Sequence, residues 1–289
     1  MNTILEFLKI AGLATFHQLF GTLGVFLFFG LVLFVLSKIT RNAFHNAGFP
    51  ALDLYVTGWI GTPVHELSHA VFCIVFRHKI TDMKLYSPTG TDGSLGYVRH
   101  TYDSKSLYQQ AGNFFIGAGP VIAGTYVLYL LLMYLLPNRH EITGLMSGNA
   151  MGHLTASNLP ADGRSIWSFA STLTTVVFST ENFSSGAFWL FLYLSVSIAS
   201  HMGLSPSDVK GMSAGLLTIL LIVFLVNCGA ALMHTELNRY VMKANTWSDG
   251  FVCLFVWAAV IALINFIVSY MLLGIIFFLR KKSVLSILS

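Results

Sequence analysis

The sequence contains uncharged apolar runs that approach or exceed the length needed to cross a lipid bilayer. About 20 helical residues span a hydrocarbon layer of ~30 Å. The runs cover residues 13–36, 111–136, 186–200, 211–233 and 251–279. A sixth apolar segment, 52–76, differs because it carries ionisable side chains. The pattern predicts an all-α polytopic membrane protein with about six transmembrane helices.

The composition agrees with this interpretation. Hydrophobic residues make up 55% of the 289 residues and charged residues only 10%, whereas soluble domains carry about 25% charged residues. The three cysteines lie in apolar runs without CxxC spacing, so neither a disulfide framework nor a thiolate zinc site is indicated. We expect one membrane-embedded domain over 1–289, with its core at approximately 52–215 and flanking transmembrane helices at 13–36 and 251–279.

The ionisable side chains of segment 52–76 include the motif HELSH, residues 65–69. On a helix His65 and His69 lie on one face, one turn apart, at the spacing that lets two imidazoles hold one metal ion. Glu66 is then placed to take a proton from water at the metal. The alternative is that both histidines are buried polar residues bonded to neighbouring helices. Ionisable groups in membrane spans usually mark function, which favours the metal site.

A catalytic zinc site normally has three protein ligands, so a further side chain must approach the histidines. We predict Asp208 as the third ligand, because the spans that end near His69 and near Asp208 run in the same direction and reach the same membrane face. Asp162 is the alternative, although it starts from the opposite face. His201 is a candidate for a residue that supports the ligands or for an alternative ligand, and Asn158 is a candidate for a supporting residue. Ser205 to Asp208 also fits a helix capping box, a role that would compete for the same carboxylate.

Two connections between the runs have structure of their own. The sequences KITDMKLY and LGYVRH flank the turn-rich SPTGTDGS, a pattern that predicts a membrane-associated β-hairpin-like loop after the HExxH helix. Residues 138–185 form the longest connection, and the segment 165–180 within it predicts an in-plane or re-entrant helix.

The order of these features resembles the site-2 protease family of intramembrane zinc metalloproteases. The resemblance covers roughly residues 55–215: HELSH in a span, the hairpin-like loop, GAGP at 117–120, and an aspartate two spans after the HExxH motif. The aspartate lies in LSPSDVKG, whereas the family usually has an asparagine-proline stretch before Leu-Asp-Gly. The segment NLPADG at 158–163 looks superficially closer to that pattern.

The resemblance implies a zinc metalloendopeptidase that hydrolyses a peptide bond in or near a membrane-spanning segment. Zinc would be held by His65, His69 and Asp208, with Glu66 as the general base. The expected partners are a single-span membrane protein substrate and the lipid bilayer, not nucleic acid. We expect a bacterial inner-membrane protein with both termini cytoplasmic, since Lys and Arg are more numerous on the side that holds them.

Two other functions use the same cluster. An ion or metal transporter would place His and Glu along a transmembrane pathway, but it predicts ionisable residues in the centres of several spans, and most spans have almost none. A catalytically silent membrane scaffold would keep the metal fold for partner binding. The substrate and the oligomeric state are not encoded in any pattern of the sequence.

Overall fold

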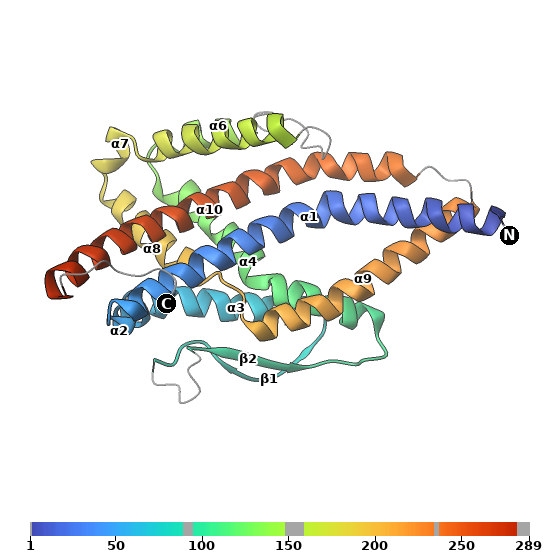
Figure 1. Ribbon diagram of the computed structural model, residues 1–289, viewed down its shortest axis with the longest axis horizontal. Helices are drawn as coiled ribbons and strands as arrows, with labels where there is room; N and C mark the ends of the chain where they lie inside the picture. Colours follow the sequence, from blue (N-terminus) through green and yellow to red (C-terminus); the bar gives the residue numbers. More distant parts are fainter. Residues whose placement is uncertain (1, 89–94, 148–158, 234–236, 282–289) are drawn as a thin grey trace.

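The computed structural model describes residues 2–88, 95–147, 159–233 and 237–281, which are mostly helical (Figure 1). The elements are α1 (Asn2–Asn46), α2 (Pro50–Leu52), the π-helical segment η1 (Asp53–Gly58), α3 (Trp59–Val75), β1 (Lys79–Lys84), β2 (Tyr97–Thr101), α4 (Leu107–Leu135), α5 (Arg139–Ser147), α6 (Leu159–Val177), α7 (Thr180–Phe183), α8 (Gly186–Ser200), α9 (Pro206–Leu232) and α10 (Leu237–Lys281).

Four of the described helices are long and apolar enough to cross a membrane. The stretches are Phe26–Asn46 in α1, Leu107–Leu135, Pro206–Leu232 and Val252–Leu279 in α10. These helices indicate a multi-pass membrane protein. Judged by length and apolar character, the described helices therefore number fewer than the six predicted spans. Segment 186–200 forms α8, which has only 15 residues, and segment 52–76 is divided among α2, η1 and a 17-residue α3.

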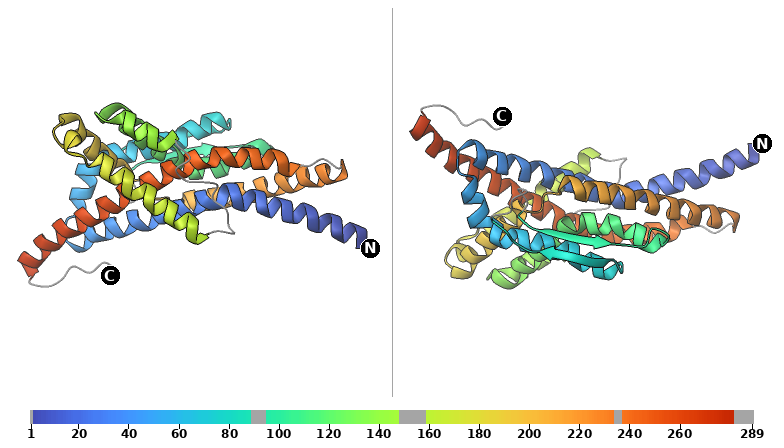
Figure 2. Two further views of the ribbon diagram at one scale, coloured as in Figure 1. Left: turned by 90° about the horizontal axis from the view of Figure 1, so that it is seen from above. Right: turned by 90° about the horizontal axis from the view of Figure 1, so that it is seen from below.

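The helices pack around α4, which contacts α3, α8, α9 and α10. In Figure 1 the two-stranded sheet lies on one side of the helices, next to α3, while α6 lies on the opposite side and packs against α10. Helix α6 corresponds to the helix predicted at 165–180, although it begins earlier. The views in Figure 2 show that α1 and α10 run beside each other along the length of the molecule.

Large apolar side chains from distant parts of the chain fill the space between these helices. Phe114 of α4, Phe191 of α8 and Trp257 of α10 are each at most 1% exposed. The rings of Phe191 and Trp257 are stacked with their centroids 6.0 Å apart. Burial of such rings supplies a large share of packing energy, so this core fixes the relative positions of α4, α8 and α10.

Glycines of α4 let α3 and α9 approach α4 closely. A Cβ atom on Gly117 would lie 2.5 Å from the carbonyl oxygen of Asp208, and one on Gly119 would lie 3.2 Å from that of Ser68. Small residues allow such backbone contacts between membrane helices. The GAGP segment of the sequence therefore brings both α3 and the start of α9 against the same part of α4.

The predicted hairpin flanks form a two-stranded antiparallel sheet. Lys79 pairs with Thr101 and Lys84 with Tyr97, with an irregularity between Ile80 and Asp82. Residues 89–94 of the connecting loop lie outside the described part of the chain. The sheet contacts α3 through both strands, which places β2 beside the HELSH motif; its association with a membrane stays a prediction.

Candidate metal centre

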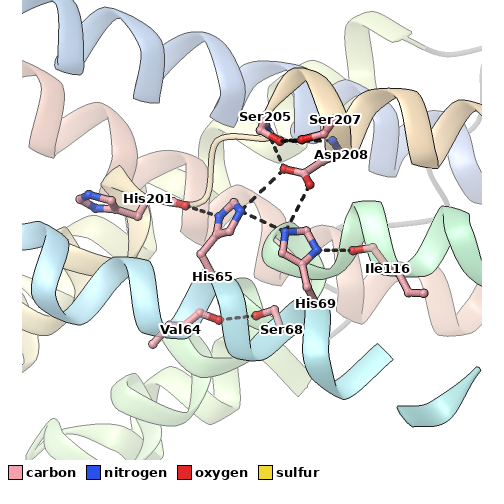
Figure 3. Close-up of polar contacts among 9 residues, drawn as sticks. All are labelled: Val64, His65, Ser68, His69, Ile116, His201, Ser205, Ser207 and Asp208. Atoms are coloured by element: carbon pink, nitrogen blue, oxygen red, sulfur yellow. Dashed lines mark hydrogen bonds and ion pairs between the residues drawn. The ribbon is translucent and has the colours of Figure 1, made fainter. Parts of the chain in front are cut away.

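The two histidines of α3 lie one helical turn apart and point in the same direction. The ring centroids of His65 and His69 are 4.9 Å apart, and their Nε2 atoms are 3.1 Å apart. Figure 3 shows both Nε2 atoms directed towards the first turn of α9. Pro63 lies inside α3 without ending it, so the helix is continuous through the motif. The spacing of four residues has therefore produced the expected shared face.

Asp208 stands opposite the histidine pair in the first turn of α9. Its Oδ1 is 3.3 Å from Nε2 of His69, and its Oδ2 is 3.7 Å from Nε2 of His65. Asp208 also belongs to a capping box: its Oδ2 accepts a hydrogen bond from the Ser205 backbone N–H at 2.7 Å, and its own N–H donates to the Ser205 hydroxyl. Because Oδ1 takes no part in the capping box and is directed at His69, one carboxylate oxygen remains available for metal binding.

Backbone carbonyls fix the proton positions on both imidazoles. Nδ1 of His65 donates to the carbonyl of His201, and Nδ1 of His69 donates to the carbonyl of Ile116, each at 2.7 Å (Figure 3). A carbonyl oxygen can only accept, so each neutral ring carries its proton on Nδ1 and a lone pair on Nε2. This is the arrangement by which supporting hydrogen bonds orient metal-binding histidines.

The three side chains fit a tetrahedral metal ion. The two Nε2 atoms are 3.1 Å apart, and the two carboxylate oxygens of Asp208 lie 3.3 Å from Nε2 of His69 and 3.7 Å from Nε2 of His65. Ligands about 2.0–2.1 Å from a tetrahedral zinc ion are ~3.3 Å from one another. The side chains are only 9–13% exposed, so surrounding water does little to reduce the electrostatic repulsion between the two lone pairs and the carboxylate. A bound cation at their centre would remove the repulsion. Among the described residues, His65, His69 and Asp208 form a group of side chains that lie close enough together to hold a metal ion.

Glu66 lies beside the cluster without a polar partner of its own. Its side chain is 7% exposed and makes no hydrogen bond or ion pair with another described residue. The chain just before β2 closes over it, since a Cβ atom on Gly96 would lie 2.8 Å from Glu66 Cγ. A buried carboxylate without partners is unfavourable, so its position next to the histidines indicates a role in binding or chemistry.

Two cavities meet at this site. One, of about 470 Å³, is lined by α1, α3 and the segment that joins α8 to α9, and it reaches His65 and Glu66. The other, of about 300 Å³, contains His65, Glu66, His69 and Asp208 in its wall together with Gly96, Tyr97, Val98 and His100. Glu66 borders both cavities, and the edge formed by β2 lines the second.

The other predicted site residues are placed differently. His201 contributes its main-chain carbonyl, whereas its buried ring bonds within its own segment through Ser197 and Ser200. Asn158 lies outside the described residues. Asp162 belongs to α6, and its side chain is not among those described. Helix α6 packs against α10 and α5, while α3 packs against α4 and α8.

The sequence patterns did not predict the two carbonyl acceptors of the histidines or the two basic residues that line the larger cavity. The carbonyls of Ile116 and His201 have no sequence signature, because any residue type supplies the same group. Lys38 and Arg41 on α1 line the larger cavity. Their signal was present, since the two cations stand three positions apart just after the apolar run 13–36, but their distance from HELSH in the chain hid the connection.

Comparison of the chain with protein-family models, curated proteins and solved structures finds no match.

Proposed function

We propose that this protein is an intramembrane zinc metalloprotease that hydrolyses a peptide bond in or near the transmembrane segment of another protein. The observation that carries the proposal is the convergence of two Nε2 lone pairs and the Asp208 carboxylate beside the unpaired Glu66. Two histidines, one carboxylate and an adjacent glutamate are a donor set typical of catalytic zinc in peptidases.

In the proposed reaction His65, His69 and Asp208 hold zinc, which supplies Lewis acidity when bound. Glu66 takes a proton from the attacking water and delivers it to the leaving amine nitrogen. Both transfers involve the same carboxylate, which has no competing hydrogen-bond partner among the described residues. The carbonyls of His201 and Ile116 keep the imidazoles oriented during the reaction.

A membrane helix hides its carbonyls in its own hydrogen bonds, so the substrate must unwind before it is cleaved. We propose that the unwound segment pairs with β2, whose residues Tyr97 and Val98 line the smaller cavity. Addition of a strand supplies the main-chain hydrogen bonds that lipid cannot offer. The proposed substrate is therefore a single-span membrane protein.

The site-2 protease resemblance supports this proposal through the order of HELSH, sheet, GAGP and aspartate along the chain. Location in a bacterial inner membrane, with both termini in the cytoplasm, is part of the same proposal. It rests on the resemblance and on the distribution of Lys and Arg.

Replacement of the general base tests the proposal. Glu66→Gln keeps the shape of the side chain and removes its basicity, so we expect kcat to fall about 10²–10⁴-fold while bound zinc is retained. The measurement is cleavage of candidate single-span substrates in detergent micelles, with zinc content determined on the same samples. A Glu66→Gln protein that cleaves like the wild type would contradict the assignment. Zinc binding without any cleavage by the wild type would favour the scaffold.

A further inference from the structure

The larger cavity contains two cations that the proposed mechanism does not use. Lys38 and Arg41 are the charged residues of the span Phe26–Asn46, and they lie three positions apart on α1. Positions three apart share one helix face, and both side chains line the cavity that reaches His65 and Glu66. Both residues are exposed and lie towards the C-terminal end of this span, so their charges are accessible to a ligand that enters the cavity.

These cations lack anionic partners among the described residues. Neither Lys38 nor Arg41 forms an ion pair or a side-chain hydrogen bond there, and Lys38 only lies 6.0 Å from the centre of the Phe34 ring. Arg41 extends towards the segment after α8, where a Cβ atom on Gly203 would be 3.9 Å from Nη2. The cavity therefore contains two available cations and one carboxylate, Glu66, which the proposed reaction requires.

A buried hydroxyl in the same wall also lacks a partner. Thr62 is 5% exposed, and its Oγ1 has no hydrogen-bond partner. It lies one helical turn before Glu66 and borders the same cavity. Because this Oγ1 atom has essentially no exposed surface, it does not face the cavity, and the two cations alone indicate the ligand chemistry, an anion with acceptor oxygens.

We propose that Lys38 and Arg41 form an anion subsite that binds a carboxylate of the peptide substrate close to the scissile bond. The inference rests on the proposed protease function and adds a substrate preference to it. A peptide is the favoured ligand because the cavity is continuous with His65 and Glu66, so whatever occupies it adjoins the reacting group. Arg binds carboxylates through paired N–H donors, and the carboxylate belongs either to an Asp or Glu side chain or to the peptide C-terminus.

The test measures binding without cleavage, using the full chain with Glu66→Gln in detergent micelles. The probes are fluorescent transmembrane peptides of Leu and Ala with an amidated C-terminus. Each carries one Asp at successive positions and is matched by an Asn peptide. A further Asn peptide has a free C-terminus. We expect at least one Asp peptide, or the free-terminus peptide, to bind about tenfold more tightly than its neutral match, as charge-assisted hydrogen bonds allow.

Adding Lys38→Gln and Arg41→Gln should abolish this advantage. The matched control, Lys105→Gln with Arg139→Gln, removes one exposed Lys and one exposed Arg outside both cavities and should preserve it. Equal affinity of all matched pairs would overturn the subsite, as would an advantage that survives loss of Lys38 and Arg41. Binding of anionic lipid that depends on these two residues, with no preference among peptides, would also overturn it. Failure of the protease function would appear separately, as absence of zinc or cleavage in the wild type.

Discussion

At the scale of single residues, Asp208 belongs both to the capping box of α9 and to the proposed metal site. Its Oδ2 accepts a hydrogen bond from the Ser205 N–H, and its Oδ1 is directed at His69. The sequence contained both roles but not their compatibility, because that depends on how the carboxylate plane is turned. The capping box orients the carboxylate before any metal binds, which reduces the entropy lost on binding.

Two substitutions separate these roles. The amide oxygen of Asn can accept the same hydrogen bond from the Ser205 N–H but carries no charge, so Asp208→Asn should weaken zinc binding at least about tenfold while leaving the metal-free protein close to wild-type stability. Asp208→Ala should lose zinc binding and, with the hydrogen bond to the Ser205 N–H, also about 0.5–1.5 kcal/mol of stability. Zinc titration and thermal unfolding of the metal-free proteins measure the two effects. Unchanged zinc affinity in Asp208→Asn would remove Asp208 from the ligand set.

At the scale of elements, the sheet is attached to the helices by a pair of histidines. Nε2 of His78 donates to the carbonyl of Gln109 at 2.8 Å, and Nδ1 of His78 is 3.0 Å from Nδ1 of His100. Since the Gln109 carbonyl only accepts, a neutral His78 has its proton on Nε2 and accepts at Nδ1 from His100. The ring of His78 also stacks on Tyr102 with centroids 5.0 Å apart. These contacts connect β2 to the start of α4.

This attachment should weaken in acid. Burial lowers the pKa of His78 below its ordinary value of 6.5, and burial followed by the charge of His78 lowers the pKa of His100. Below about pH 6.5 the unfolded chain binds protons more readily than the folded one, so the free energy of unfolding decreases as the pH is lowered. A protonated His78 would also place its Nδ1–H against the Nδ1–H of His100, and the hydrogen bond between the two rings would be lost. We expect faster amide exchange in β1 and β2 at pH 5.5 than at pH 7.5, after correction for intrinsic rates.

His100→Asn provides the control for this effect. It removes one titrating group, so the additional exchange at pH 5.5 should become smaller. A difference between the two pH values as large as in the wild type would show that the histidine pair does not control how the sheet is attached.

At the scale of the whole molecule, the sequence predicted the membrane class and the approach of Asp208 to the two histidines better than the number of spans. Apolar runs located α4, α8, α9 and the apolar part of α10, because hydropathy is a local property. The spacing of HELSH predicted a shared face for the same reason. Segment 52–76 was harder to predict, since it includes the π-helical segment η1, which has no clear sequence signature. The carbonyls that orient the histidines depend on tertiary packing and could not be predicted.

We propose that the folded chain binds one zinc ion through two histidines and a carboxylate. X-ray absorption at the zinc edge of the purified protein measures the identity and distance of the ligands. We expect about one zinc ion per chain with only nitrogen and oxygen ligands at about 2.0–2.1 Å. Replacement of His65 and His69 by Ala should abolish zinc binding. Absence of zinc, or sulfur ligands at about 2.3 Å from the cysteines, would contradict it.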